Sequence, residues 1–279
     1  MGVIEQKEQL SQLTQQLTLF SNSFMKVVFQ DIKACEYVLR ILTGNNQLVL
    51  KSVRTEYEMS KVYSHDSRLD VLAEDIEGKL YNLELQRDSY LDHARRTRFY
   101  SSMVDSEMLQ KRKDYNELPD LTIFYISEKD IWKGMCTIYD LEKTLNNSTN
   151  DYEDGIHIVY VNASVNDDSE IARLMQYFKT ADPNDKRFGP LSERVHFLKC
   201  EEEGIEIMCR IEEQIKEIGL EIGKEIGKEI GKEIGRDQAM KEVVVRMSRR
   251  GKSVLEIVDD TGVDMDRAQM WMKEAMSAT

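Results

Sequence analysis

The spacing of apolar residues divides the first two hundred positions into helical and extended segments. Apolar side chains recur every three or four positions in residues 24–42, which predicts an amphipathic helix capped by Asn22 or Ser23. Gly44 is expected to end this helix. Extended runs follow at 47–58, 68–74, 80–86, 121–126, 136–140 and 156–161, and further helices are expected at 90–109 and 169–179. This order predicts a mixed α/β core that ends near Cys200.

Residues 68–86 alternate between polar and apolar side chains and predict a β-hairpin. With the turn centred on Glu77, opposed residue numbers sum to 154, so that Asp70 faces Glu84. One face of the hairpin then carries Arg68, Asp70, Asn82, Glu84 and Gln86, and the other carries Leu69, Val71, Ala73, Tyr81, Leu83 and Leu85. The apolar face is expected to pack on the core, and a slip of one residue would separate the two carboxylates.

The pair formed by Asp70 and Glu84 is open to two interpretations. Directly opposed side chains have Cβ atoms about 5 Å apart, where two carboxylates repel each other. A divalent cation between them would relieve the repulsion, and hard oxygen ligands suit Mg²⁺ or Mn²⁺. Alternatively, both carboxylates belong to a polar face that simply points to solvent. The spacing alone does not decide between a metal site and a solvated surface.

A cluster of arginines follows the hairpin. Residues 87–98 contain four arginines and two aspartates. The arginines are Arg87, Arg95, Arg96 and Arg98. Arg95 and Arg98 share one face of the expected helix. Beside a carboxylate pair the cluster would form a clamp for phosphate groups, whereas elsewhere such a helix face is an ordinary solvated surface.

The chain changes character after residue 200. From Glu217 onward, glutamate, isoleucine and glycine recur with period four. A helix advances about 400° in four residues, so the isoleucine stripe drifts and forms no sustained coiled-coil seam. Each glycine costs a helix about 1 kcal/mol relative to alanine. Residues 201–236 are therefore expected to form a marginally stable helical spacer or an oligomerisation helix. If they form a spacer, a chain truncated after Cys200 should still fold.

Residues 237–279 return to ordinary amphipathic patterning. They predict three short helices at 237–250, 254–261 and 265–276. Three helices with a glycine turn are compatible with a helix-turn-helix, and the stretch 236–252 has six basic residues against two acidic ones. However, residues 265–275, which would be the recognition helix, are rich in methionine. DNA binding and a protein-contact role fit this small all-α extension equally well.

The composition of the chain disfavours several classes of protein. The 279 residues carry a formal net charge of −13, which disfavours a uniformly basic nucleic-acid binder but allows a local basic patch. The four cysteines and four histidines lack zinc-ligand spacing, and thiols without a disulfide framework fit a reducing cytoplasm. No run of 18 consecutive apolar residues and no signal peptide occurs, so a cytoplasmic protein with no membrane partner is expected.

An ordered set of motifs runs from Ser67 to Ser127. It consists of a strand aspartate at Asp70, a hairpin, the strand end Glu84-Leu85-Gln86, the basic helix with Arg95, Arg96 and Arg98, and the apolar strand Leu121 to Ile126. This set resembles the core of the Rpn family of recombination-promoting nucleases and transposases, within the PD-(D/E)xK nuclease superfamily. The helix that opens at Asn22, the segment 154–162 and the glycine-glutamate repeat are also similar to this family.

The resemblance implies a PD-(D/E)xK fold, with a mixed sheet flanked by helices, over residues 21–200. Residues 1–20 would be a polar arm in front of it. The implied activity is metal-dependent hydrolysis of DNA phosphodiesters with low sequence specificity, associated with recombination or transposition. The rival interpretation is a catalytically degenerate nuclease fold that serves as a DNA-binding or protein-interaction module. The C-terminal helices offer a contact for a homo-oligomer.

The resemblance also implies a role for particular residues. Asp70, Glu84 and the backbone carbonyl of Leu85 would hold Mg²⁺ or Mn²⁺. Gln86 stands where the wider superfamily has lysine; it can orient a water by hydrogen bonding but supplies no charge. The superfamily often adds an acidic residue from the first helix, which points to Glu36. The arginines after the hairpin would grip the DNA backbone.

Overall fold

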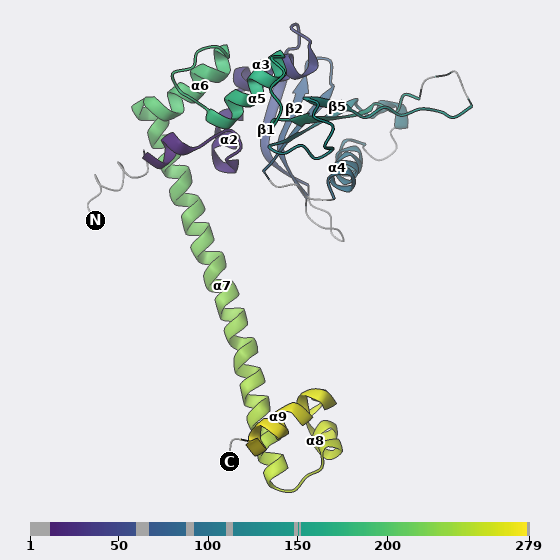
Figure 1. The fold of residues 1–279 in the computed structure, drawn as a ribbon, viewed down its shortest axis with the longest axis vertical. Helices are drawn as coiled ribbons and strands as arrows, with labels where there is room; N and C mark the ends of the chain where they lie inside the picture. Colours follow the sequence, from purple (N-terminus) through teal and green to yellow (C-terminus); the bar gives the residue numbers. More distant parts are fainter. Residues whose placement is uncertain are drawn as a thin grey trace. The chain divides into compact units, whose positions relative to one another are not determined.

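The structure is a computed structural model that describes residues 12–59, 67–87, 92–109, 114–147, 150 and 152–277 (Figure 1). Residues 1–11 of the expected polar arm and residues 90–91 of an expected helix lie outside the described residues. The chain divides into two compact units, Met1–Glu212 and Glu213–Thr279. The first unit contains the β-sheet, and the second contains helices α8 (Val254–Thr261) and α9 (Met265–Ser277).

Strands of the first unit form one mixed sheet of six strands in the order β1-β2-β3-β4-β6-β5. The strands are β1 (Leu50–Met59), β2 (Ser67–Asp75), β3 (Leu80–Gln86), β4 (Leu121–Ser127), β5 (Ile138–Asp140) and β6 (Ile156–Asn162). β1, β2 and β3 pair antiparallel, β3, β4 and β6 pair parallel, and β5 pairs antiparallel with β6. Each extended segment predicted from the sequence is a strand of this sheet.

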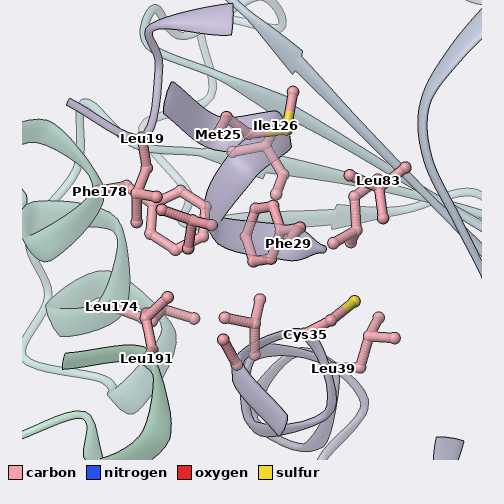
Figure 2. Close-up of a cluster of buried hydrophobic side chains, with 14 of the residues drawn as sticks. Leu19, Met25, Phe29, Cys35, Leu39, Leu83, Ile126, Leu174, Phe178 and Leu191 are labelled. Carbon is pink, nitrogen blue, oxygen red and sulfur yellow. The ribbon is translucent and has the colours of Figure 1, made fainter. Parts of the chain in front are cut away.

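Helices cover both faces of the sheet (Figure 1). One face carries α2 (Asn22–Phe29), α3 (Ile32–Thr43), α5 (Glu170–Thr180) and α6 (Gly189–Cys200). Their apolar side chains form a core with alternate strand residues such as Leu83 and Ile126 (Figure 2). The opposite face carries α4 (His93–Met108), whose Tyr100, Met103 and Val104 pack with Leu72, Leu80, Ile123 and Tyr125. The predicted mixed sheet flanked by helices is confirmed.

The predicted single helix at residues 24–42 is wrong, because the segment forms two helices separated around Asp31. The Asp31 carboxylate accepts hydrogen bonds from the backbone N–H groups of Lys33 (2.9 Å) and Ala34 (3.0 Å), so it caps a new helix. Gly44 ends α3 as predicted, in the left-handed conformation with φ at 67°.

The end of the expected polar arm belongs to the core. Leu19 and Phe20 are buried, and the Phe20 ring contacts the ring of Phe178 with centroids 6.2 Å apart. The buried Lys199 holds this segment, because its Nζ donates to three backbone carbonyls, that of Leu17 at 2.7 Å. A buried ammonium group without such acceptors would be costly. The core therefore includes residues in front of position 21.

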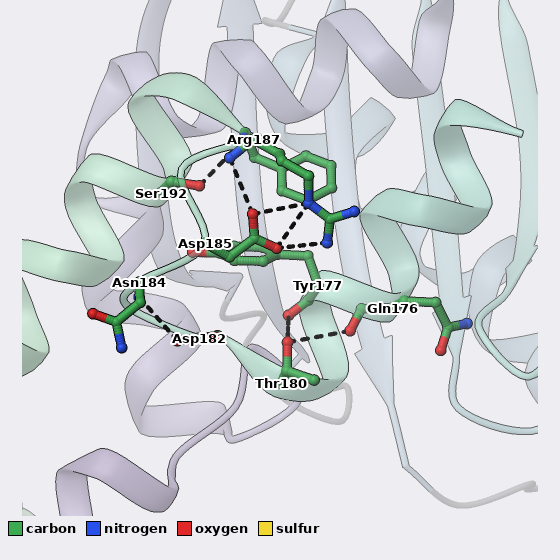
Figure 3. Close-up of polar contacts among 9 residues, drawn as sticks. Gln176, Tyr177, Thr180, Asp182, Asn184, Asp185, Arg187 and Ser192 are labelled. Carbon is green, nitrogen blue, oxygen red and sulfur yellow. Dashed lines mark hydrogen bonds and ion pairs between the residues drawn. The ribbon is translucent and has the colours of Figure 1, made fainter. Parts of the chain in front are cut away.

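The sequence did not predict α6. Asp185 holds the turn that leads into it, because its carboxylate accepts from the backbone N–H and the guanidinium of Arg187 (Figure 3). Ser192 Oγ then accepts from the Phe188 N–H (3.2 Å). The helix buries polar residues such as Ser192 and Lys199 beside its apolar ones. These buried polar residues weaken the contrast between an apolar and a polar face by which a surface helix is recognised in a sequence.

The core continues into α7 (Glu202–Arg249), beyond the predicted end at Cys200. Met208 is fully buried in it, and Ile211 packs against the same core. Gly204 lies so close to α6 that a Cβ atom there would be 2.0 Å from the carbonyl oxygen of Phe197. The first turns of α7 therefore complete the core of the α/β unit.

A chain that ends at Glu212 should unfold cooperatively and keep the secondary structure of the first unit. A chain that ends at Cys200 should melt at a lower temperature or fail to fold, because loss of a buried methionine side chain alone costs about 2–5 kcal/mol. Thermal denaturation followed by circular dichroism compares the two chains. Equal melting temperatures would show that the start of α7 contributes nothing to the core.

The second unit has a small apolar core of its own. Val244 of α7, Ile257 of α8, and Ala268 and Trp271 of α9 are buried in it. The predicted helix 254–261 is confirmed, with Ser253 as its N-cap and Gly262 in the left-handed conformation at its end. The period-four repeat is helical, and its role as spacer or oligomerisation helix stays a prediction. No helix among the described residues combines the length and the apolar character that a membrane crossing requires.

Residues 237–249 of the predicted helix 237–250 are the end of α7 and not a separate helix, contrary to the prediction. Basic residues gather on this part of α7, where Lys241, Arg246, Arg249 and Arg250 line a groove of about 600 Å³. On the expected recognition helix, Arg267 pairs with Asp237 and lies over the Trp271 ring. DNA binding and protein contact by this unit both stay predictions.

Candidate active site

The hairpin of β2 and β3 has the predicted register. Leu72 lies opposite Asn82, and Glu74 lies opposite Leu80. Beyond these pairs, the backbone N–H of Asp70 donates to Oε1 of Glu84 (3.3 Å). The backbone N–H of Leu85 donates to Oδ2 of Asp70 (3.0 Å). Each carboxylate is therefore held by the backbone of the opposite strand, and the predicted proximity of Asp70 and Glu84 is confirmed.

Asn82 and Glu84 of the polar face are buried and Asp70 and Gln86 are half-buried, so the carboxylate pair does not belong to a solvated surface. Only 1% of Asn82 and 1% of Glu84 is exposed. Asn82 Nδ2 donates to Oε1 of Glu84 (3.3 Å) beneath the layer formed by α4. Leu69, which was expected on the opposite, apolar face, also packs with residues of α4. A buried carboxylate needs compensating partners far more than an exposed one does.

Burial and the neighbouring carboxylate change the acidity of Glu84. Desolvation raises the pKa of Glu84 from its ordinary value of 4.5 to about 8, and the negative charge of Asp70 adds to the rise. The hydrogen bonds from the Asp70 N–H and from Asn82 offset this only in part. Near neutral pH the pair therefore retains a proton unless a cation takes its place.

The carboxylate pair lies in a pocket of about 400 Å³. Six residues predicted for the site line it: Asp70, Glu84, Leu85, Gln86, Arg87 and Arg96. The other lining residues are Tyr100 of α4 and, from the N-terminal segment and α2, Leu19, Phe20, Asn22 and Met25. The structure thus brings the end of the hairpin, one face of α4 and the start of α2 together.

α4 directs one of its three arginines into the pocket. Arg96 is half-buried, and its Nη2 donates to the hydroxyl of Tyr100 (2.8 Å), one turn further along the same face. Arg95 and Arg98 are exposed and do not line the pocket. Of the four arginines predicted to bind phosphate, Arg87 and Arg96 therefore line the pocket, and DNA binding by Arg95 and Arg98 stays a prediction.

Arg87 is the second pocket arginine, and it links β3 to the N-terminal segment. Its Nη2 donates to Oγ of Ser21 (3.1 Å). Ser21 directly precedes Asn22, which lines the pocket. The pocket therefore depends on a contact between residues 66 positions apart.

Glu36 is not brought to the pocket. Its carboxylate accepts from the backbone N–H of Leu50 (2.9 Å) and pairs with Arg40 (2.6 Å), so it joins α3 to the start of β1. The predicted and observed positions of Glu36 differ because the chain breaks around Asp31 into two helices. α2 faces the pocket, whereas Glu36 lies on α3. Asn22 of α2 supplies the polar side chain instead, and the sequence marked it only as a helix cap.

The donor set of the pocket fits a hard divalent cation. Among the described residues, two buried polar atoms near Glu84 have no hydrogen-bond partner: Oδ1 of Asn82 and the hydroxyl of Tyr125, which is the β4 residue paired with Glu84. Waters around a cation would satisfy them. The described part of the chain contains no group of three or more His, Cys, Asp or Glu residues that could hold a metal. Few protein ligands and several waters are what Mg²⁺ usually takes.

A mixed sheet flanked by helices, in which a buried glutamate and a half-buried aspartate meet beside an arginine-bearing helix, is the architecture of a PD-(D/E)xK-like α/β protein. A family model described as PD-(D/E)XK nuclease family transposase matches residues 40–217, more than half of the chain. The chain belongs to this family, so the resemblance predicted from the sequence is confirmed. No curated protein and no solved structure matches it. The family supports a nuclease- or transposase-related function, and PD-(D/E)xK nucleases generally use divalent metal ions.

Proposed function

We propose that the protein is a DNA endonuclease that hydrolyses phosphodiester bonds with low sequence specificity and depends on Mg²⁺ or Mn²⁺. One observation carries the proposal: Asp70 and the buried Glu84 meet in a pocket that Arg96 also lines. Paired carboxylates bind a hard cation, and a guanidinium binds phosphate. The pocket therefore combines the two groups that metal-assisted hydrolysis of a phosphodiester requires.

Asp70, Glu84 and the backbone carbonyl of Leu85 would hold the cation. When bound, the cation lowers the pKa of a water and neutralises charge that builds on the phosphate. The N–H groups of Asp70 and Leu85 keep both carboxylates in place through bonds of 3.3 and 3.0 Å. Gln86 lines the pocket two residues after Glu84 and orients the attacking water by hydrogen bonding.

Arg87 and Arg96 bind the phosphate backbone of the substrate. Both line the pocket, and both carry a permanent positive charge. Contacts to phosphate position a DNA strand but carry no information about its bases, so this recognition gives low sequence specificity. The match to a nuclease family of transposases supports an association of this cleavage with transposition or, more broadly, recombination.

Cleavage of supercoiled plasmid DNA by the purified full chain tests the proposal. We expect nicked and linear products with Mg²⁺ or Mn²⁺, none with EDTA, and renewed cleavage when Mg²⁺ exceeds the chelator. Plasmid that is bound but stays intact with either metal would favour the alternative, a degenerate nuclease fold that acts as a binding module. Glutamine in place of the superfamily lysine at Gln86 is the feature that makes this alternative worth testing.

Replacing Arg96 with alanine should weaken substrate binding much more than replacing Arg95. We expect the KM for plasmid to rise by roughly 10-fold or more with Arg96→Ala, since a charged hydrogen bond contributes about 1.5–3 kcal/mol. Arg95→Ala removes the same charge from the neighbouring, exposed position and should leave the KM within about twofold of wild type. Equal effects of the two changes would indicate that only the net charge of α4 matters.

A further inference from the structure

Trp132 presents an exposed aromatic surface in the connection between β4 and β5. Its exposed fraction is 47%. The indole contacts the rings of His93 (centroids 4.7 Å apart, interplanar angle 84°) and Tyr160 (5.2 Å, 86°). His93 and Tyr160 are buried and also contact each other, with centroids 5.4 Å apart. One side of the indole therefore packs against two buried rings of the protein.

Hydrogen bonds hold the segment around Trp132 in one conformation. The Asp130 carboxylate accepts from the backbone N–H groups of Lys133 (2.9 Å) and Met135 (2.8 Å) and from the Tyr139 hydroxyl (2.8 Å). Lys133 and Met135 have positive φ angles of 57° and 56°, which such bonds stabilise. An indole held in this way loses little freedom when a ligand contacts it.

The fold places Trp132 close to the carboxylate pocket. Its segment leaves β4 beside the pocket, where the Glu128 N–H donates to the carbonyl of Gln86 (3.0 Å). The indole packs on His93, which is three residues before Arg96 and seven before Tyr100 on α4. These spacings put all three on one face of the helix, about 5–10 Å apart along its axis. Trp132, which packs on His93, therefore lies about one helix turn from the position of Arg96 on α4.

We propose that Trp132 is a stacking platform for an unpaired base of the DNA strand that the pocket cleaves, an inference that rests on the proposed function. Every nucleobase has a π-face, and stacking on an aromatic side chain tolerates any base sequence. This fits phosphate-based recognition by Arg96. A base stacks on Trp132 only when it is not paired within a duplex, so the site favours single-stranded or locally opened DNA.

Tryptophan fluorescence tests this proposal in the full chain. The protein has two tryptophans, and Trp271 of the second unit is only 6% exposed. Trp271→Phe leaves Trp132 as the sole indole, and Glu84→Gln in the same chain prevents cleavage during the titration. The probes are a short dye-labelled oligo-dT strand and a strand of equal length and charge whose sugars carry no bases. Dye anisotropy reports binding of either strand, and indole emission reports stacking.

We expect oligo-dT to quench the Trp132 emission in a saturable way, and the abasic strand to bind without quenching. Trp132→Ala should weaken oligo-dT binding by about 5- to 100-fold but binding of the abasic strand by less than about threefold. Trp132→Phe keeps a ring on His93 and Tyr160, so it should fold normally and retain most of the affinity. Trp132→Leu keeps an apolar contact with His93 and Tyr160 but has no π-face. It replaces Trp132→Ala in the binding test if the alanine variant is unstable.

Three results would contradict the stacking platform. They are equal quenching of the Trp132 emission by both strands, an equal loss of affinity for both strands in Trp132→Ala, and no binding of oligo-dT. Plasmid cleavage by the wild-type chain separates this result from the proposed function. Cleavage without base-dependent quenching would remove only the stacking platform. Base-dependent quenching by a protein that cleaves nothing with Mg²⁺ or Mn²⁺ would retain the platform and remove the nuclease activity.

Discussion

Replacing Glu84 with glutamine is expected to reduce plasmid cleavage on the order of 10³-fold or more, because the change removes a negative ligand and keeps the size of the side chain. The amide oxygen can still accept from the Asp70 N–H, whose bond to Glu84 is 3.3 Å long. The fold should therefore survive, and the loss should appear in kcat. Single-turnover cleavage with Mg²⁺, together with a melting curve of each protein, measures both quantities.

Glu74→Gln is the matched control for this loss. Glu74 is a carboxylate on β2, four residues from Asp70, but it pairs with Lys51 (2.6 Å) and does not line the pocket. Its replacement removes the same charge from the same hairpin, and we expect cleavage within about twofold of wild type. A Glu84→Gln protein that is folded and cleaves as fast as Glu74→Gln would show that the carboxylate pair is not the reaction centre.

In metal-free buffer, Glu84→Gln should make the protein more stable than wild type at alkaline pH. Burial raises the pKa of Glu84 to about 8 from an ordinary 4.5, so the folded wild type binds a proton more tightly than the unfolded chain does. That proton stabilises the fold fully below the ordinary pKa, and its contribution is lost as pH rises through about 8. Glutamine is neutral throughout, so the variant does not share this loss.

The two melting temperatures should be similar near pH 5, and the variant should melt roughly 5–10 °C higher near pH 9. Differential scanning calorimetry with EDTA across this range measures the difference. Glu74→Gln serves again as the control, since it should follow the wild-type curve. Parallel curves for wild type and Glu84→Gln would mean that Glu84 titrates as an ordinary carboxyl group.

The part of the site that sequence predicts is the part that local pattern determines. The alternation of Leu69 to Leu85 and the turn at Glu77 fix a register, and the structure has that register. Proximity of Asp70 and Glu84 follows from it without knowledge of the rest of the fold. The same holds for α8, where Ser253 and Gly262 mark both ends.

The part of the site that the sequence does not predict depends on contacts between residues that are distant in sequence. Nothing in the hairpin indicates that α4 buries Glu84, and this burial turns a polar surface into a pocket. The signal at Asp31 was local and available, because an aspartate before an apolar run is a helix cap. This cap places Glu36 on a second helix, whereas Asn22 lies on the helix that faces the pocket.

The choice between Arg96 and its neighbours also required the fold. Arg95, Arg96 and Arg98 have the same charge, and the sequence offers no reason to prefer one. Packing of Thr97, Tyr100 and Val104 on the sheet sets the rotation of α4, and that rotation turns Arg96 toward the carboxylates. The sequence thus identifies the helix, and the tertiary packing selects the residue.

The central claim is that Asp70 and Glu84 together hold a divalent cation, and Mn²⁺ binding measured by electron paramagnetic resonance tests it most directly. Free Mn²⁺ gives a signal that binding removes, so the affinity is obtained without DNA or turnover. We predict that wild type and Glu74→Gln bind Mn²⁺ with the same affinity. Asp70→Asn and Glu84→Gln should each bind Mn²⁺ more than about 10-fold more weakly, because loss of a residue that only hydrogen-bonds to a metal ligand already lowers metal affinity by about 10-fold or more. Wild-type affinity in both pocket variants, with both folded, would contradict the account.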